Sequence, residues 1–300
     1  MSLLEKAMAR VSARVDRALD RFLLREGIAP SVIHKAMRYS VFAGGKRLRP
    51  FLCVGAAELC GGRAERVIPT ACALEVLHTY SLVHDDLPSM DDDDLRRGRP
   101  TSHKVFGEGM AILAGDALLT FAFELMARNA RVKGVKPAWA LAAVETVARE
   151  AGTLGMVGGQ AADLEAEDAE FDARAREGML HFIHSRKTGA LIRASLRAGA
   201  LLSGASAKKV KALDAYGEKI GMAFQIADDI LDIIGDKALL GKRGSDRDNG
   251  KLTFPAVYGL EESQDRAREA VAGAKKALRL FGRRARQFEE LADFIIERRK

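Results

Sequence analysis

The sequence contains few of the residues that mark several protein classes. Its 300 residues include three cysteines, at positions 53, 60 and 72, and no Cys-x-x-Cys pair. An odd count without such a pair predicts neither a disulfide framework nor a zinc site, so we expect three reduced thiols. With 28 glycines, seven prolines and no short period, collagen-like and low-complexity structures are excluded.

Long apolar runs are also missing. We find no run near the ~18 apolar residues of a membrane span. The N-terminus carries Glu5, Lys6, Arg10 and Arg14 where a signal peptide needs an apolar segment. These absences predict a cytoplasmic protein that has no membrane partner.

The composition is that of a globular protein with a sizeable core. Hydrophobic residues make up 48% and charged residues 30% of the chain, which excludes disorder for most of it. The net charge of +7 suits either an anionic ligand or a solvated basic surface. Aromatic residues are only 6%, whereas a nucleic-acid binder needs a basic stripe with interleaved aromatics, so we expect no nucleic acid.

Strong helix formers dominate the sequence, and alternating strand patterns are rare. We therefore predict an all-α fold of about ten helices, a single large bundle around a central cavity, with 1–300 as one domain. The polar, glycine-rich stretch 235–250 is predicted to be a mobile functional loop. Helical spacing marks 71–87, 110–128, 138–157, 174–202, 207–234 and 285–298, with breaks at 44–45, 61–62, 134–137, 158–159 and 250–255.

One acidic cluster lies near the end of a predicted helix. Asp228 and Asp232 are four residues apart, so they lie on one helix face with Gln225 a turn earlier. Like charges at this spacing destabilise a helix, and here the flanking residues are isoleucines and a leucine. Divalent cations such as Mg²⁺, which prefer oxygen ligands, would remove that repulsion. We interpret Asp228, Asp229 and Asp232 as candidate metal ligands, with a solvated acidic face as the alternative.

A second acidic cluster contains Asp85, Asp86 and the run 91–94. In an unbroken helix Asp85 and Asp91 would point about 240° apart. Pro88 cannot continue the helical hydrogen bonds, so we predict a break that turns Asp91 back toward Asp85. His78 lies two turns before Asp85 on nearly the same face, either as a ligand or as a structural residue.

Basic residues accompany both acidic clusters. The glycine pair 44–45 precedes a predicted helix, and its backbone amides with Lys46 and Arg49 form a candidate phosphate site. Further basic candidates are Arg96, Arg97, Arg99, Lys187, Lys242 and Lys251. Two metal-binding clusters, several basic segments and apolar helices together indicate a diphosphate attached to a hydrocarbon tail. No P-loop, Rossmann glycine pattern or Ser-His-Asp order supports nucleotide or acyl-transfer chemistry.

These motifs make the sequence resemble the head-to-tail trans-isoprenyl diphosphate synthases, from about residue 30 to the end. Two extra residues in the first motif resemble the bacterial farnesyl diphosphate synthases, and no motif position departs from the pattern. The matching segments are Gly44-Gly45-Lys46-Arg47-Leu48-Arg49-Pro50, Asp85-Asp86-Leu87-Pro88-Ser89-Met90-Asp91, Asp94-Leu95-Arg96-Arg97-Gly98-Arg99-Pro100-Thr101, Lys187-Thr188-Gly189, Phe224-Gln225, Asp228-Asp229-Ile230-Leu231-Asp232 and Gly250-Lys251-Leu252-Thr253-Phe254-Pro255.

The resemblance implies an isoprenoid synthase fold, a homodimer, and about three Mg²⁺ ions, with Mn²⁺ as a possible substitute. It implies condensation of isopentenyl diphosphate with dimethylallyl and geranyl diphosphates to give (2E,6E)-farnesyl diphosphate and diphosphate. The implied site residues are Lys46, Arg49, His78 and Arg97 for isopentenyl diphosphate; Asp85, Asp91 and Asp228 as principal metal ligands, with Asp86, Asp229 and Asp232 close by or ligating through water; Arg96, Lys187 and Lys251 for the allylic diphosphate; Thr188, Gln225 and the Lys187 backbone beside the cation; and Tyr80 and Ser81 as the floor that limits chain length. The alternative for Tyr80 is a core aromatic with no steric role. The charge of Lys242 in the loop 235–250 separately offers a further phosphate contact.

Several alternatives stay open at this point. A geranylgeranyl diphosphate synthase of the same family would share every motif. An HD-type phosphohydrolase could use His84 and Asp85, although the sequence has only six histidines and no suitable cluster of them. A terpene cyclase lacks the second aspartate-rich helix and the glycine turn, and a basic nucleic-acid binder is disfavoured by the acidic clusters.

Overall fold

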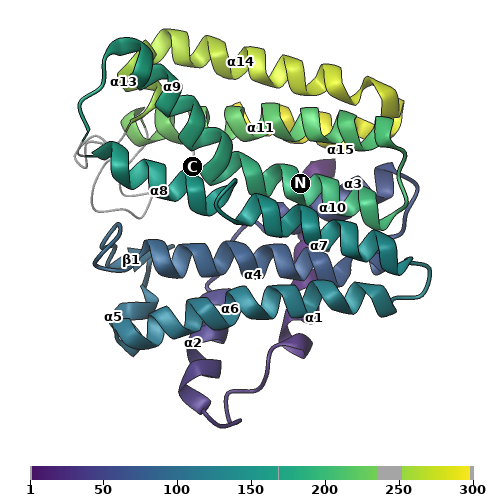
Figure 1. Ribbon diagram of the computed structural model, residues 1–300. Coiled ribbons are helices and arrows are strands. Elements are labelled where there is room, and N and C mark those ends of the chain that lie inside the picture. Colours follow the sequence, from purple (N-terminus) through teal and green to yellow (C-terminus); the bar gives the residue numbers. More distant parts are fainter. Residues whose placement is uncertain (1, 168, 235–251, 298–300) are drawn as a thin grey trace.

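The computed structural model describes residues 2–167, 169–234 and 252–297 (Figure 1). The α-helices are α1 (Leu3–Phe22), α2 (Ser31–Val41), α3 (Leu48–Leu59), α4 (Ile68–Asp85), α5 (Ser102–Phe106), α6 (Glu108–Arg128), α7 (Pro137–Ala151), α8 (Met156–Glu167), α9 (Ala173–Ile183), α10 (Gly189–Leu202), α11 (Ala207–Ile234), α13 (Phe254–Tyr258), α14 (Leu260–Ala277) and α15 (Arg286–Glu297). Shorter elements are the 3₁₀ helices η1 (Ala64–Arg66), η2 (Asn129–Arg131) and η4 (Leu278–Ala285), the π-helical turn η3 (His184–Thr188), and the strands β1 (Leu95–Arg96) and β2 (Arg99–Pro100). The all-α prediction is confirmed.

Two helices form the centre of the bundle because they are apolar on almost every side. Helix α4 packs along α6, and α10 lies against α3, α7 and α11. A helix that is hydrophobic all round is stable only when neighbours cover it, which places α4 and α10 inside. In Figure 1 the C-terminal ends of α4 and α11 lie at the same end of the bundle, on the left. Both acidic motifs therefore occupy one end of the molecule.

The prediction of one helix over 138–157 is wrong at its C-terminal end, because the helix ends earlier than expected. Helix α7 ends at Ala151, and α8 begins at Met156. The glycines at 158–159, predicted as a break, lie inside α8. A Cβ atom on Gly159 would come within 2.2 Å of the Lys187 backbone nitrogen, so this glycine allows α8 and η3 to approach closely.

The predicted helix 174–202 is also interrupted. It consists of α9 and α10 with the π-helical turn η3 between them. Such turns are rare and are frequently found at functional sites.

Helix α6 corrects the expectation that no segment is long and apolar enough for a membrane. The stretch Glu108–Arg131 contains 18 residues of mean hydropathy 1.7, of which 39% are buried. A core helix passes the same test of length and composition, so we infer no membrane span from it. The three cysteines are free, as predicted, and Cys53 and Cys72 are buried.

Candidate active site

The first acidic motif begins where α4 ends. The helix stops at Asp85, and the chain then turns through Pro88 so that the backbone N–H of Asp91 donates to the carbonyl of Asp85 at 2.8 Å. Asp92 adopts a left-handed conformation with φ of 48° within this turn. The predicted break is therefore confirmed, and it brings Asp91 back beside Asp85.

Asp86 lies in a different environment from its neighbour. It is buried, and its carboxylate accepts a short hydrogen bond from Arg96 Nε. The same guanidinium donates through Nη2 to Asp93 at 3.1 Å. Burial raises the pKa of Asp86 to about 6, and the charge of Arg96 opposes that shift. Asp86 thus fixes the position of Arg96 at the start of the β1–β2 hairpin.

The glycine turn places basic side chains against this hairpin. Gly44 and Gly45 adopt positive φ angles of 92° and 126°, which glycine tolerates. Arg97 donates to the carbonyl of Gly44 and lies where a side chain on Gly45 would be, since a Cβ there would come within 2.6 Å of Arg97 Nη1. Helix α3 begins just after the turn, at Leu48, as predicted.

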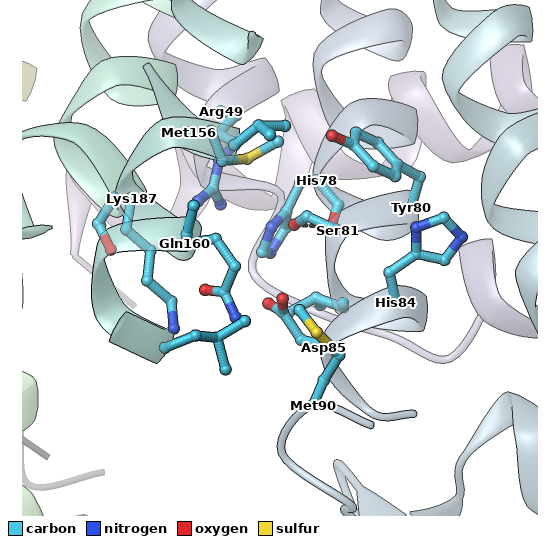
Figure 2. A pocket seen from close by; sticks show the side chains of 15 residues that line it. Arg49, His78, Tyr80, Ser81, His84, Asp85, Met90, Met156, Gln160 and Lys187 are labelled. Carbon is cyan, nitrogen blue, oxygen red and sulfur yellow. Dashed lines mark hydrogen bonds between the residues drawn. The ribbon is translucent and has the colours of Figure 1, made fainter. Parts of the chain in front are cut away.

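Two neighbouring cavities meet at this part of the bundle. The first, which we call the acid cavity, has a volume of about 380 Å³ and contains Asp85 in its wall. Figure 2 shows Lys187 and Gln160 on one side of it and Asp85, Ser81 and His78 on the other. The residues lining the acid cavity are Arg49, His78, Tyr80, Ser81, Leu82, His84, Asp85, Met90, Met156, Val157, Gln160, Ala161, Leu164, Lys187 and Thr188.

The second, which we call the basic cavity, has a volume of about 540 Å³. It combines the glycine turn and Arg97 with an apolar wall from α1, α11 and α15. Arg49 and His78 line both cavities. The residues lining the basic cavity are Met8, Ala43, Gly45, Lys46, Arg47, Leu48, Arg49, Glu75, His78, Arg97, Phe224, Leu291, Phe294 and Ile295.

Burial controls the charge of the two shared residues. Desolvation lowers the pKa of Arg49 to about 10, and the nearby Glu75 carboxylate opposes the shift, so Arg49 stays charged at neutral pH. Desolvation also lowers the pKa of His78 well below 6.5, and the charge of Arg49 adds to that effect. His78 is therefore a neutral imidazole beside a guanidinium.

The π-helical turn supplies the opposite wall of the acid cavity. Lys187 Nζ pairs with the Asp163 carboxylate at 2.6 Å, and the Thr188 hydroxyl donates to Gln225 Oε1 at 2.9 Å. Sequence reasoning missed Asp163 and Gln160, although their spacing of three residues puts them on one helix face. Gln160 has both amide atoms buried and without a hydrogen-bond partner among the described residues, so it presents an unused donor and acceptor.

The second acidic motif lies on α11. Asp228 and Asp232 are half-buried, whereas Asp229 is buried. Phe224 on the same helix lines the basic cavity, and Gln225 reaches the acid cavity through Thr188. Helix α11 therefore lines the basic cavity directly through Phe224, and it meets the wall of the acid cavity only through the hydrogen bond between Thr188 and Gln225. The three aspartates of the second motif line neither cavity.

The carboxylates of the two acidic motifs fit Mg²⁺ ions whose remaining ligands would come from a bound diphosphate. Within residues 2–167, 169–234 and 252–297, no three His, Cys, Asp or Glu side chains form a group that could hold a metal ion. Mg²⁺ commonly binds through one or two carboxylates plus phosphate oxygens and water. Asp85 and Asp91 at the end of α4 and Asp228 near the end of α11 would offer oxygen donors of that kind.

The predicted chain-length residues both line the acid cavity. The ring of Tyr80 is largely buried and makes an edge contact with the ring of His84, with centroids 5.7 Å apart. His84 in turn occupies the space above Gly115 on α6, where a Cβ would lie 2.0 Å from His84 Nε2. Lys242, Lys251 and the loop 235–250 lie outside the described residues.

The sequence and the fold are both similar to those of known proteins. The polyprenyl synthetase family model matches residues 30–280. A farnesyl diphosphate synthase from Geobacillus stearothermophilus is 47% identical over 267 residues, which cover 88% of each chain. A geranylgeranyl diphosphate synthase from Cyanophora paradoxa is 47% identical over 270 residues, covering 90% of this chain and 88% of that protein. The crystal structure of an FPP/GFPP synthase from Zymomonas mobilis superimposes with a TM-score of 0.86 at 37% identity, covering 98% of each chain.

Proposed function

The chain belongs to the polyprenyl synthetase family and is a trans-prenyl diphosphate synthase, and we propose that its product is (2E,6E)-farnesyl diphosphate. In this proposal residues 1–300 form one synthetase domain that condenses isopentenyl diphosphate with dimethylallyl and then geranyl diphosphate. The observation that carries the proposal is the pair of adjoining cavities that share Arg49 and His78, one with Asp85 and Lys187 in its wall and the other with Lys46 and Arg97.

The basic cavity suits isopentenyl diphosphate. Lys46, Arg49 and Arg97 supply positive charge around it, and His78 supplies a neutral ring that can donate a hydrogen bond. Guanidinium groups bind phosphate oxygens through two parallel N–H donors. The apolar wall of Phe224 and Phe294 would cover the five-carbon end of the substrate.

The acid cavity suits the allylic substrate. Its diphosphate would lie near Arg96 and Lys187, with Asp85, Asp91 and Asp228 as the principal ligands of about three Mg²⁺ ions. Asp86, Asp229 and Asp232 would lie close to these ions or bind them through water. Mg²⁺, or Mn²⁺ in its place, would supply Lewis-acid stabilisation of the departing diphosphate. Lys242 and Lys251, outside the described residues, would add further phosphate contacts.

The side chains of this site suit three successive events: ionisation, condensation and elimination. Arg96 and Lys187 stabilise negative charge on the leaving diphosphate. The oxygen atoms of Thr188 and Gln225, with the Lys187 carbonyl, would flank the allylic carbon and would lower the energy of the cation. The double bond of isopentenyl diphosphate attacks from the side of Arg49 and His78, and the released diphosphate accepts the proton that is lost.

Assays with each substrate separate this function from hydrolysis. Diphosphate should be released from dimethylallyl plus isopentenyl diphosphate in Mg²⁺, and not after metal removal by a chelator. Release from either substrate alone at the same rate would indicate a phosphohydrolase instead.

Both acidic motifs should be required as a unit. Asp85→Ala and Asp228→Ala should each lower kcat by about a thousandfold or more, and the double variant should lose little beyond that. Near-normal turnover by Asp228→Ala in saturating Mg²⁺ would contradict the two-motif assignment.

Product length should depend on Tyr80. The helical rise places its Cα about 7.5 Å from Asp85 along α4, a suitable depth for the floor of the tail pocket together with Ser81. Removing the ring by Tyr80→Ala should extend the product from fifteen to twenty carbons. Mass analysis with isopentenyl diphosphate in excess tests this, and a wild type that makes mainly twenty carbons would favour the geranylgeranyl alternative.

We further propose a cytoplasmic homodimer that needs neither nucleic acid nor membrane. Helix α6 leaves Ile112 and Leu113 exposed at 45% and 54%, an apolar surface that a second copy of the chain would cover. Sedimentation of the purified protein should give twice the mass of 32.5 kDa, and Leu113→Glu should shift it toward the monomer.

A further inference from the structure

Asp229 differs from the two other carboxylates of its motif. Only 2% of Asp229 is exposed, whereas Asp228 and Asp232 are half-buried. Both of its carboxylate oxygens accept hydrogen bonds from protein donors. Oδ1 accepts from Gln225 Nε2 at 2.9 Å, and Oδ2 accepts from the backbone N–H of Phe254 at 2.8 Å.

These bonds connect three separate parts of the chain. The Thr188 hydroxyl on η3 donates to Gln225 Oε1, Gln225 Nε2 donates to Asp229 on α11, and the Phe254 amide at the start of α13 donates to the same carboxylate. Asp229 accepts at both carboxylate oxygens, from Gln225 Nε2 and from the Phe254 backbone N–H, and this leaves Gln225 Oε1 to accept from Thr188. Asp229 therefore determines which end of the Gln225 amide faces Thr188.

His184 supports the same junction from η3. Its buried ring stacks on the ring of Phe254, with centroids 5.3 Å apart and planes 20° apart. His184 Nε2 lies 3.5 Å from Asp229 Oδ2. The start of α13 is therefore held by a backbone hydrogen bond from one side and an aromatic contact from the other.

We propose that Asp229 is a positioning residue and not a direct metal ligand. Its carboxylate attaches α13 to α11 and orients Gln225 so that the carbonyl oxygen of Gln225 accepts the Thr188 proton. This inference rests on the proposed function, in which Thr188 and Gln225 lie beside the allylic carbon. Asp228, one residue earlier, keeps the role of metal ligand.

An Asp229→Asn variant would reverse the bonds without removing them. The Asn carbonyl can keep the Phe254 N–H, and its amide N–H must then donate to Gln225. The Gln225 amide has to turn over to accept, which leaves its Nε2 facing Thr188. The Thr188 hydroxyl must then accept where it now donates, so the polar atoms beside the allylic carbon exchange places.

The experiment compares Asp229→Asn and Asp229→Ala with the matched control Asp228→Asn. Calorimetry measures Mn²⁺ binding in the presence of inorganic diphosphate, hydrogen exchange follows the Phe254 amide, and steady-state kinetics separate kcat from KM. We expect Asp228→Asn to weaken Mn²⁺ binding about tenfold or more, because a ligand carboxylate is lost. Asp229→Asn should change it less than about threefold, because the Asn side chain keeps both protein partners.

The two Asp229 variants should differ from each other. Asp229→Ala should speed exchange of the Phe254 amide about tenfold or more, because a buried donor loses its acceptor. Asp229→Asn should preserve that protection but lower kcat about tenfold with little change in the KM for isopentenyl diphosphate.

Two results would overturn the proposal. One is a loss of Mn²⁺ affinity in Asp229→Asn as large as in Asp228→Asn, which would make Asp229 a ligand. The other is unchanged Phe254 exchange in Asp229→Ala. Neither readout requires turnover, so both remain decisive even if the wild-type enzyme makes a different product.

Discussion

Replacing Arg47 by methionine should destabilise the folded protein by about 3–5 kcal/mol. From the sequence alone Arg47 is one of three basic residues that follow a glycine turn, and nothing marks it as buried. Only 3% of its side chain is exposed, and it makes three bonds. Nη1 donates to Glu75 at 2.8 Å, Nε to Asp16 at 2.9 Å, and Nη2 to the Val41 carbonyl at 2.8 Å.

The size of the effect follows from what the substitution leaves behind. The Glu75 side chain is also 3% exposed, so Arg47→Met leaves a buried carboxylate without its hydrogen-bonded counter-charge, and only the more distant charges of Arg49 and Arg97 remain to offset it. Loss of the ion pair with Asp16 should lower the stability only slightly, because 41% of the Asp16 side chain is exposed to solvent. Removing both buried charges in Arg47→Met with Glu75→Leu should therefore recover most of the loss.

Urea unfolding at pH 7 measures these free energies. Arg17→Met, at an exposed position of α1, is the control and should change stability by less than about 0.5 kcal/mol. A loss below about 1 kcal/mol in Arg47→Met would show that the buried pair does not stabilise the turn. A double variant with a lower free energy of unfolding than both Arg47→Met and Glu75→Leu would show the same.

Two other substitutions test the shared wall and the floor of the acid cavity. Desolvation and the charge of Arg49 lower the pKa of His78, so below pH 6.5 the histidine gains a proton only in the unfolded state. The free energy of unfolding of the wild type should therefore fall as the pH decreases. The fall should be steeper than that of His78→Asn by up to about 1.4 kcal/mol per pH unit. Equal slopes of unfolding free energy between pH 6.5 and 5.5 would contradict this. Gly115→Ala should push the His84 ring from its place and shorten the product, whereas Gly109→Ala on the same helix, with nothing within 4 Å, should not. Restoration of the wild-type product by His84→Ala in the Gly115→Ala background would confirm the cause by mass analysis, and identical products from both glycine variants would refute it.

Helix content and the position of the acidic motifs were predictable from local chemistry. Apolar spacing marks helices wherever one face is buried, and Pro88 enforces the break that returns Asp91 to Asp85. The failures concern contacts between distant segments. Gly159 is typical of a helix break in the sequence, but it lies inside α8. Glycine is needed at this position because the Lys187 backbone leaves no room for a side chain.

Residue type alone also could not separate side chains that share a motif. Lys46, Arg47 and Arg49 are equivalent as basic residues of one turn, yet Arg47 is engaged by Glu75 and Asp16. Asp85 and Asp86 are adjacent carboxylates, yet only Asp86 is buried against Arg96. These distinctions arise from tertiary burial, which neither spacing nor charge reveals.

The position of His78 in the wall between the cavities explains why a half-buried, neutral histidine suits this site. Arg49 retains its charge and attracts a diphosphate, while desolvation keeps the imidazole of His78 uncharged. In the proposed reaction a carbocation forms in the acid cavity, and its electrostatic energy depends on every charge nearby. A protonated imidazole between that cation and the attacking double bond would raise the barrier. Desolvation of His78 would thus allow the wall to donate a hydrogen bond to one substrate without adding positive charge beside the other.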